Sequence, residues 1–171
     1  MRVYSSIRYS PIAKSILLSA KEDSIAIADE LIVDALHNCL RRLPSQILRS
    51  AILIPIPGSK RAIRKRGRDF IFELTSELSL RSGIPIVSGM KIERRLLDQS
   101  GLSAVDRKRN ISGSYSAKEI STDLTGELIL VDDLVTTGAT LLEARRALKE
   151  RGIAANFAIT ACMAQSLNIG G

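Results

Sequence analysis

A strand, a helix and a second strand follow one another near the end of the sequence, and this pattern limits the fold more than any other feature. Residues 126–131 are mostly apolar, as in a buried strand. Residues 140–151 have a helical period that ends before Gly152, and residues 154–161 form a second apolar run. Two strands joined by one helix favour a βαβ unit. The sequence therefore predicts an α/β fold with a mainly parallel sheet flanked by helices.

The remaining segments are compatible with one domain over residues 1–171. We expect a helical N-terminal part (1–45), a core (51–164) and a short tail (165–171). Within them the pattern predicts helices at 10–20, 24–40 and 69–80, a strand at 51–56, one or two short strands in 84–93, and a long polar loop over 94–116.

Charge and cysteine content limit the kinds of partner and site that we expect. The net charge is +7, and residues 58–110 carry the excess, with thirteen Lys and Arg against six Asp and Glu. A local basic region indicates an anionic partner, either nucleic acid or a phosphorylated small molecule. Cys39 and Cys162 have no metal-binding spacing and are expected to be reduced and buried. With no apolar run long enough for a membrane span and no export signal, we expect a cytoplasmic protein.

The segment Leu128-Ile-Leu-Val-Asp-Asp-Leu-Val-Thr-Thr-Gly-Ala-Thr140 has the most specific chemistry. Its two acids follow the predicted strand, at the sheet edge where α/β proteins bind ligands. The loop Thr136–Thr140 then leads into a helix, and its amides favour a phosphate. Thr140-Leu-Leu-Glu143 also has the form of a capping box. Carboxylates for a diol beside a loop for a phosphate match a ribose 5-phosphate.

These thirteen residues resemble the motif that binds 5-phosphoribosyl-1-pyrophosphate (PRPP) in type I phosphoribosyltransferases. The resemblance implies that Asp132 and Asp133 contact the ribose hydroxyls. It also implies that Thr136, Thr137, Gly138, Ala139 and Thr140 hold the 5-phosphate. An apolar strand ending in two acids is also the form of a Walker B strand, but the sequence contains neither GxxxxGK[ST] nor GxGxxG.

A second anion-binding loop is expected after the strand at 51–56. Gly58, Ser59, Lys60 and Arg61 combine a glycine that lets backbone amides approach an anion with two cations. We predict that they bind the pyrophosphate. The basic cluster at 64–68 faces either the same pyrophosphate or a nucleic-acid backbone, and a solvated surface is the alternative.

Further segments resemble the ComF family, which is amidophosphoribosyltransferase-like and associated with competence and DNA uptake. They are 54–57, Arg66-Gly67, 99–102 and 107–110. ComF proteins typically begin with a four-cysteine zinc module, so the resemblance indicates a short or truncated form. This chain also has Arg68-Asp69-Phe70 where the family usually continues Arg-Gly with an aromatic residue, Asn or Asp, and Gln.

The segment from Gln99 to Asn110 occupies the place of the flexible loop, or hood, that closes over PRPP in related enzymes. A lid excludes water from an activated sugar. We expect Arg107 to be its catalytic cation and Asn110 to position it. An ordinary polar loop is the alternative.

The resemblance implies displacement of pyrophosphate from PRPP by a nitrogen nucleophile, with Asp132, Asp133 and Arg107 as catalytic residues. Mg²⁺ is the expected cofactor, held mainly through PRPP rather than by protein ligands. Tyr115 and Phe157 are candidates for stacking on an acceptor that the sequence does not name. The alternative is a non-catalytic PRPP-fold module in DNA uptake or PRPP sensing. Its partners would be single-stranded DNA or competence proteins, and a homodimer is a further expectation.

Overall fold

The computed structural model describes residues 1–93, 110–118 and 126–164. Its centre is a parallel sheet in the order β1-β6-β5-β2, formed by β1 (Arg2–Arg8), β6 (Phe157–Met163), β5 (Glu127–Val135) and β2 (Ala51–Pro55). The crossover from β5 to β6 runs through α7 (Ala139–Lys149), as in a βαβ unit. The predicted α/β class and parallel sheet are therefore confirmed.

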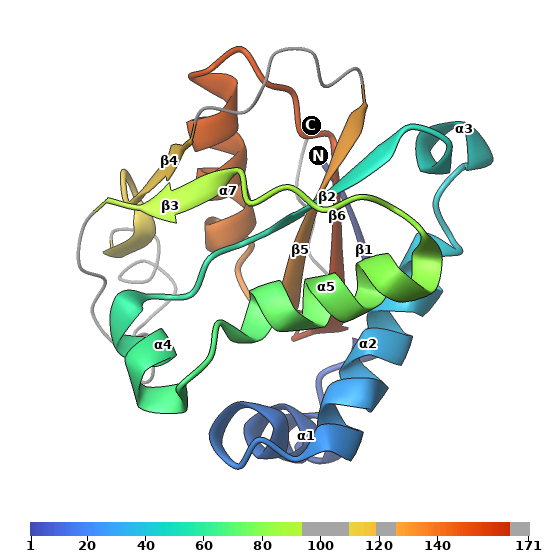
Figure 1. Ribbon diagram of the computed structural model, residues 1–171, viewed down its shortest axis with the longest axis vertical. Helices are drawn as coiled ribbons and strands as arrows, with labels where there is room; N and C mark the ends of the chain where they lie inside the picture. Colours follow the sequence, from blue (N-terminus) through green and yellow to red (C-terminus); the bar gives the residue numbers. More distant parts are fainter. Residues whose placement is uncertain (94–109, 119–125, 165–171) are drawn as a thin grey trace.

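One face of the sheet is covered by several helices, and the other face is covered by the helix α7 (Figure 1). The first face carries α2 (Ala26–Leu40) and α5 (Phe70–Ser82), with α1 (Pro11–Glu22) beyond them near the carboxyl ends of the strands. On the α7 side, β3 (Met90–Ile92) and β4 (Tyr115–Ala117) form a small antiparallel sheet. Two short helices, α3 (Ser45–Leu48) and α4 (Lys60–Arg66), flank β2 in the chain.

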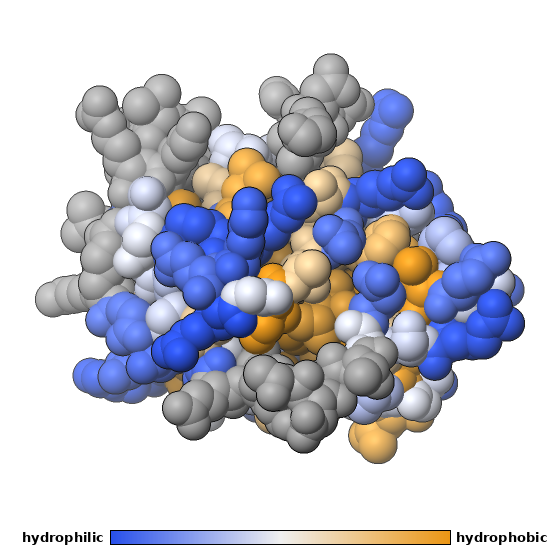
Figure 2. Space-filling view, turned by 90° about the horizontal axis from the view of Figure 1, so that it is seen from above, coloured by the Kyte–Doolittle hydropathy of each residue, from blue (hydrophilic) through white to orange (hydrophobic). Residues whose placement is uncertain are grey.

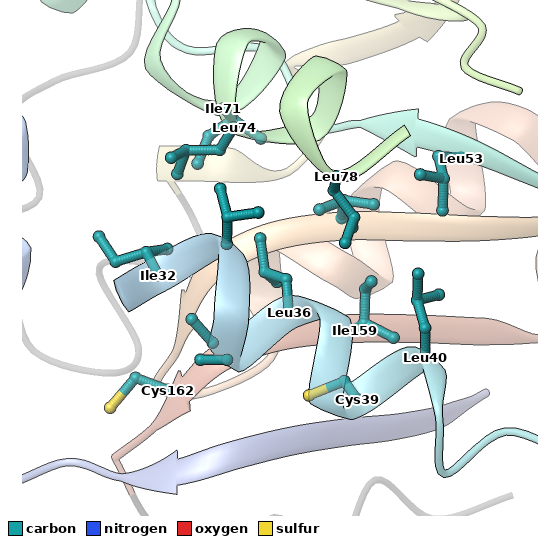
Figure 3. Close-up of a cluster of buried hydrophobic side chains, with 14 of the residues drawn as sticks. Ile32, Leu36, Cys39, Leu40, Leu53, Ile71, Leu74, Leu78, Ile159 and Cys162 are labelled. Carbon is teal, nitrogen blue, oxygen red and sulfur yellow. The ribbon is translucent and has the colours of Figure 1, made fainter. Parts of the chain in front are cut away.

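Alternation along β5 divides the core into two clusters. Ile129 and Val131 pack with α2 and α5, whereas Leu128 and Leu130 pack with α7. Figure 3 shows the first cluster, in which leucines and isoleucines of α2 and α5 meet over the strands. In Figure 2, hydrophobic residues lie near the middle of the face seen from above, between hydrophilic ones. Burial on both faces explains why β5 reads as a continuous apolar run.

Several segments differ from the sequence-based expectation. The short helices α3 and α4 were not predicted, and β4 begins at Tyr115, inside the predicted loop. β1 was not predicted, and it pairs along β6 from Arg2↔Phe157 to Arg8↔Met163 within the part expected to be helical. β5 does not stop at Val131 but continues to Val135, because its pairing with β6 persists from Asp132↔Thr160 to Val135↔Met163. The two acids thus lie inside the strand rather than after it.

Candidate functional site

The end of β5, the loop after it and the start of α7 form a small hollow. It is lined by Asp132 and by residues 134–141. α7 starts at Ala139, and its N-cap is Gly138, with φ of 74° in the left-handed region that favours glycine. Because Gly138 has no side chain, no side-chain hydrogen bond caps the helix. The Ala139 amide donates to Thr137 Oγ1 at 3.4 Å, and the start of α7 lines the same hollow as Asp132.

The predicted capping box is wrong. Thr140 is the second residue of α7 rather than its N-cap, and Glu143 is buried and directed elsewhere. Two hydrogen bonds of 2.8 Å join the Glu143 carboxylate to Arg146, and a longer one of 3.4 Å comes from the Tyr115 amide. Glu143 therefore attaches β4 to α7. The glycine at 138 is the sequence signal for the true start of the helix.

Asp132 is held in an environment that disfavours its charge. The Asp133 amide donates to Asp132 Oδ1 at 2.9 Å. Burial, and then the neighbouring charge of Asp133, raise the pKa of Asp132 well above its usual range, while Lys21 and the amide hydrogen bond act in the opposite direction. A carboxyl with a perturbed pKa beside a lined hollow is a feature of functional sites.

Asp133 is buried and forms an ion pair with α1. Its Oδ2 lies 2.5 Å from Lys21 Nζ, and the side chains are 7% and 23% exposed respectively. Sequence reasoning did not identify Lys21, because residues more than a hundred positions apart carry no local pattern. A lysine in the last turn of a helix is common for other reasons. The N-terminal helix thus supplies a charge to the acidic pair.

The loop expected to bind pyrophosphate lies beside this hollow, because β2 pairs with β5 up to Pro55↔Val131. Ser59 caps α4, since its hydroxyl accepts from the Ala62 amide at 3.1 Å. Lys60 and Arg61 are exposed in the first turn. The structure thus brings both predicted loops to the carboxyl ends of neighbouring strands.

Asp69 lies at the N-terminal end of α5, close to the same loop. Burial raises the pKa of its carboxyl group, and the backbone amides of Phe72 and Gly58 act in the opposite direction. Burial acts more strongly, so the net effect is a raised pKa.

The two aromatic candidates for stacking on an acceptor have different surroundings. Phe157 packs in the core cluster around α2 and α5, which accounts for it without a ligand. Tyr115 is buried, and its hydroxyl donates to the Pro57 carbonyl oxygen at 3.4 Å. Burial and the charges of Asp132 and Glu143 raise the Tyr115 pKa. Tyr115 therefore connects β4 to the loop after β2 rather than presenting a free ring.

Much of the basic cluster at 64–68 is neutralised within the chain. Lys65 and Arg66 pair with Glu22 of α1, and Arg66 Nη2 lies 3.3 Å from its Oε1. Arg68 pairs with Asp29 at 2.6 Å and with Glu73 at 3.1 Å. Arg68 therefore makes ion pairs at the position where the ComF resemblance expects an aromatic residue. They leave Arg64 as an exposed residue of the cluster for which no ion pair is found in residues 1–93, 110–118 and 126–164.

Arg107 lies outside the described residues, and Asn110 is buried at their edge. Within 1–93, 110–118 and 126–164, no group of three or more His, Cys, Asp or Glu is arranged to hold a metal ion. In those same segments no helix is both long enough and apolar enough to span a membrane. Both cysteines are buried and free.

Comparison with solved structures defines the class of the fold. The chain is similar to the crystal structure of adenine phosphoribosyltransferase from Trypanosoma brucei in complex with AMP, pyrophosphate and ribose-5-phosphate. The two share 11% identity with a TM-score of 0.51, and the match covers 99% of this chain and 88% of the other. The chain thus has the type I phosphoribosyltransferase fold.

Comparison with curated proteins is more specific. The chain is 31% identical to competence protein F of Haemophilus influenzae over 103 residues, which are 59% of this chain and 45% of that protein. It is also 40% identical over 65 residues to ribose-phosphate pyrophosphokinase of Shewanella oneidensis, or 37% of this chain and 21% of the enzyme. The chain therefore spans less than half of either relative. No protein-family model matches it. Fold and sequence similarity together support a ComF-type, phosphoribosyltransferase-like protein.

Proposed function

We propose that the chain binds PRPP and transfers its ribose 5-phosphate to a nitrogen acceptor, with release of pyrophosphate. The observation that carries this proposal is the hollow shared by Asp132 and the start of α7. A carboxylate that accepts from sugar hydroxyls lies there beside a helix N-terminus that favours a phosphate. The Trypanosoma brucei enzyme of the same fold was solved with ribose-5-phosphate and pyrophosphate, which supports the choice of ligand.

Each part of PRPP would be bound by a different segment of the chain. Residues 136–140 would bind the 5-phosphate through backbone amides and threonine hydroxyls. Asp132 and Asp133 would accept from the ribose 2- and 3-hydroxyls. Gly58, Ser59, Lys60 and Arg61 would face the pyrophosphate from the neighbouring strand end.

In the reaction, the bond from C1 of the ribose to the pyrophosphate oxygen breaks, and its electron pair leaves with pyrophosphate. A bond from C1 to the acceptor nitrogen forms, and the nitrogen releases a proton. Positive charge develops on the ribose ring as the leaving group departs, and Asp132 and Asp133 would stabilise it. Arg107 would act from the lid segment.

Mg²⁺ would be held mainly by PRPP oxygens and water rather than by protein ligands. In the described residues no group of three or more His, Cys, Asp or Glu forms a protein-only metal site, which suits a hard cation that enters with a phosphorylated ligand and retains part of its water shell. When bound, it would neutralise charge on the departing pyrophosphate.

Calorimetric titration with PRPP and Mg²⁺ tests the proposal. Wild-type protein should bind, and Asp132→Asn should weaken binding at least about tenfold, because charge-assisted hydrogen bonds to the ribose become neutral ones. Asp34→Asn is the matched control, since Asp34 lies on exposed α2 surface and pairs with Arg81. Absence of wild-type binding would refute the PRPP site. Pyrophosphate release with a panel of amines and nucleobases then separates an enzyme from a binding module.

A non-catalytic role in DNA uptake is the second candidate, favoured by the similarity to competence protein F. It predicts single-stranded DNA binding with a steep salt dependence. The ion pairs of Arg66 and Arg68 weaken the sequence argument for it, since those cations are already engaged. Arg64→Ala should then reduce DNA affinity more than Arg66→Ala. If neither changes DNA binding, the basic cluster is not the contact surface.

A further inference from the structure

Three consecutive residues at the end of α1 each contact a different part of the site. The Ala20 carbonyl oxygen accepts from Arg68 Nη2 at 2.6 Å. Lys21 Nζ lies 2.5 Å from Asp133 Oδ2, and Glu22 pairs with two cations of α4. The backbone before Lys21 and the side chain after it are therefore both fixed. This turn of α1 cannot shift without breaking contacts to β5, α4 and the start of α5.

The Lys21–Asp133 ion pair is well placed to act strongly. The Asp133 side chain is 7% exposed, and in the described residues no hydrogen bond besides the ion pair reaches its Oδ2. Lys21 Nζ also lies 5.6 Å from the centre of the Phe70 ring. Surroundings of this kind screen charges less than water does, so the ammonium also acts on the neighbouring Asp132 carboxylate.

We propose that Lys21 is a positioning residue of the PRPP site, which fixes the Asp133 carboxylate and offsets the charge of the Asp132–Asp133 pair so that both meet the ribose as anions. This inference rests on the proposed function. It assigns to the N-terminal helix a role that the PRPP motif itself does not contain. Lys21 acts through the two acids and need not touch the ligand.

The other titratable side chains near the Asp132–Asp133 pair do not supply a positive charge. Tyr115 from β4 faces Asp132, and Cys162 from β6 faces Asp133, but burial raises the pKa of both the phenol and the thiol. Both therefore remain uncharged at neutral pH. Burial and the charge of Asp133 raise the pKa of Asp132, and Lys21 is the cation in the described residues that opposes them. Without Lys21, Asp132 would take up a proton at a higher pH.

The protonation of Asp132 determines the direction in which PRPP binding should change. A protonated Asp132 accepts hydrogen bonds less strongly than the anion, so loss of the Lys21 charge should weaken PRPP binding at neutral pH. Raising the pH would ionise Asp132 again and restore part of the affinity. A purely structural role for Lys21 would instead weaken binding equally at every pH.

The test is calorimetric titration of PRPP with Mg²⁺ against wild type, Lys21→Met and Lys21→Arg, from mildly acidic to mildly alkaline pH. Lys21→Met should bind about tenfold more weakly at neutral pH, and the deficit should shrink as the pH rises. Lys21→Arg should retain most of the affinity because it keeps the charge. If Lys21→Met does not fold, Lys21→Gln replaces it, since glutamine keeps a donor for Asp133 but not the charge.

Glu22→Gln is the matched control, because it removes ion pairs from the same turn of α1 without touching Asp133. Its binding should vary with pH as in wild type. A deficit of Lys21→Met that is constant with pH, or no deficit, would overturn the inference while leaving the PRPP site intact. Carbon-13 NMR of the free protein gives an arm that needs no PRPP. Lys21→Met should shift the Asp132 titration to higher pH, and an unshifted titration would also overturn the inference.

Discussion

Two parallel hydrogen bonds join the Arg68 guanidinium to the Asp29 carboxylate. Nη1 donates to Oδ2 at 2.6 Å, and Nη2 donates to Oδ1 at 3.0 Å. This pair ties the chain before α5 to α2. The same guanidinium lies 5.1 Å from the centre of the Phe70 ring and donates to the Ala20 carbonyl oxygen. One side chain therefore joins α1, α2 and α5. The departure of this chain from the usual ComF pattern at position 68 gives the N-terminal helix a fixed position.

Arg68→Lys should lower the free energy of unfolding by about 2 kcal/mol, although it keeps the charge. A lysine cannot make the two parallel bonds to Asp29 or stack on Phe70, so the substitution is not conservative here. Urea unfolding monitored by circular dichroism measures the change. Arg81→Lys is the control, because its pairs with Asp34 and Glu77 are more exposed and should cost less than about 0.5 kcal/mol. Equal effects would contradict the role given to Arg68.

The parts of the fold that the sequence predicted depend on local pattern. The unit β5–α7–β6 was predicted because two apolar runs and a helical period stand next to each other. The helices α1 and α2 were also predicted from local signals, and Ser10 caps α1, its hydroxyl accepting from the Ala13 amide at 3.1 Å. The carboxylates and the phosphate loop of the candidate site lie on this unit.

The parts that were missed depend on contacts between distant residues. β1 is an edge strand of mixed polarity whose pairing with β6 joins opposite ends of the chain, so its own residues carry a weak signal. The extension of β5 through Asp132 likewise depends on β6 rather than on propensity. The ion pair of Lys21 with Asp133 joins residues that no periodicity connects. Charge partners of this kind become visible only when the fold is known.

Asp132→Asn and Asp133→Asn should have opposite effects on the stability of the free protein. Asp132→Asn keeps a side-chain oxygen for the Asp133 amide and removes a charge that its surroundings disfavour, so unfolding should become harder by about 1 kcal/mol. Asp133→Asn leaves Lys21 without its counter-ion and should cost about 2 kcal/mol. Urea unfolding at neutral pH compares them. Destabilisation by both substitutions would show that the Asp132 charge is well accommodated.

The advantage of Asp132→Asn should also depend on pH. The folded-state pKa of Asp132 is raised, so its ionised form penalises folding above that pKa. As the pH falls through the folded-state pKa, wild-type Asp132 takes up a proton and the penalty is lost. The difference in unfolding free energy between wild type and variant should therefore shrink on acidification. A constant difference would mean that it does not arise from the Asp132 charge.

Thr140→Ala should separate stability from binding. Thr140 is not an N-cap, so its loss should change the free energy of unfolding by no more than about 0.5 kcal/mol. Binding of PRPP should nevertheless weaken, since Thr140 lines the hollow at the proposed phosphate position. Ser59→Ala is the contrasting variant, because Ser59 caps α4 and its loss should cost about 1 kcal/mol. Similar costs for the two would restore the capping role of Thr140.

Gly138→Ala should damage both stability and PRPP binding, whereas Gly152→Ala should damage stability alone. Both glycines have φ of 74°, where a side chain costs about 1 kcal/mol, and nothing lies within 4 Å of a Cβ built at Gly152. Because both glycines have the same φ, the two substitutions carry the same backbone cost, and Gly152→Ala is a close control for Gly138→Ala. At Gly138, relief of strain would turn the backbone at the start of α7 and move the amides proposed to hold the phosphate. We therefore expect both variants to lose stability in urea unfolding, and a fall of about tenfold or more in PRPP affinity for Gly138→Ala only. Equal PRPP affinities in the two variants would mean that the start of α7 does not bind the 5-phosphate.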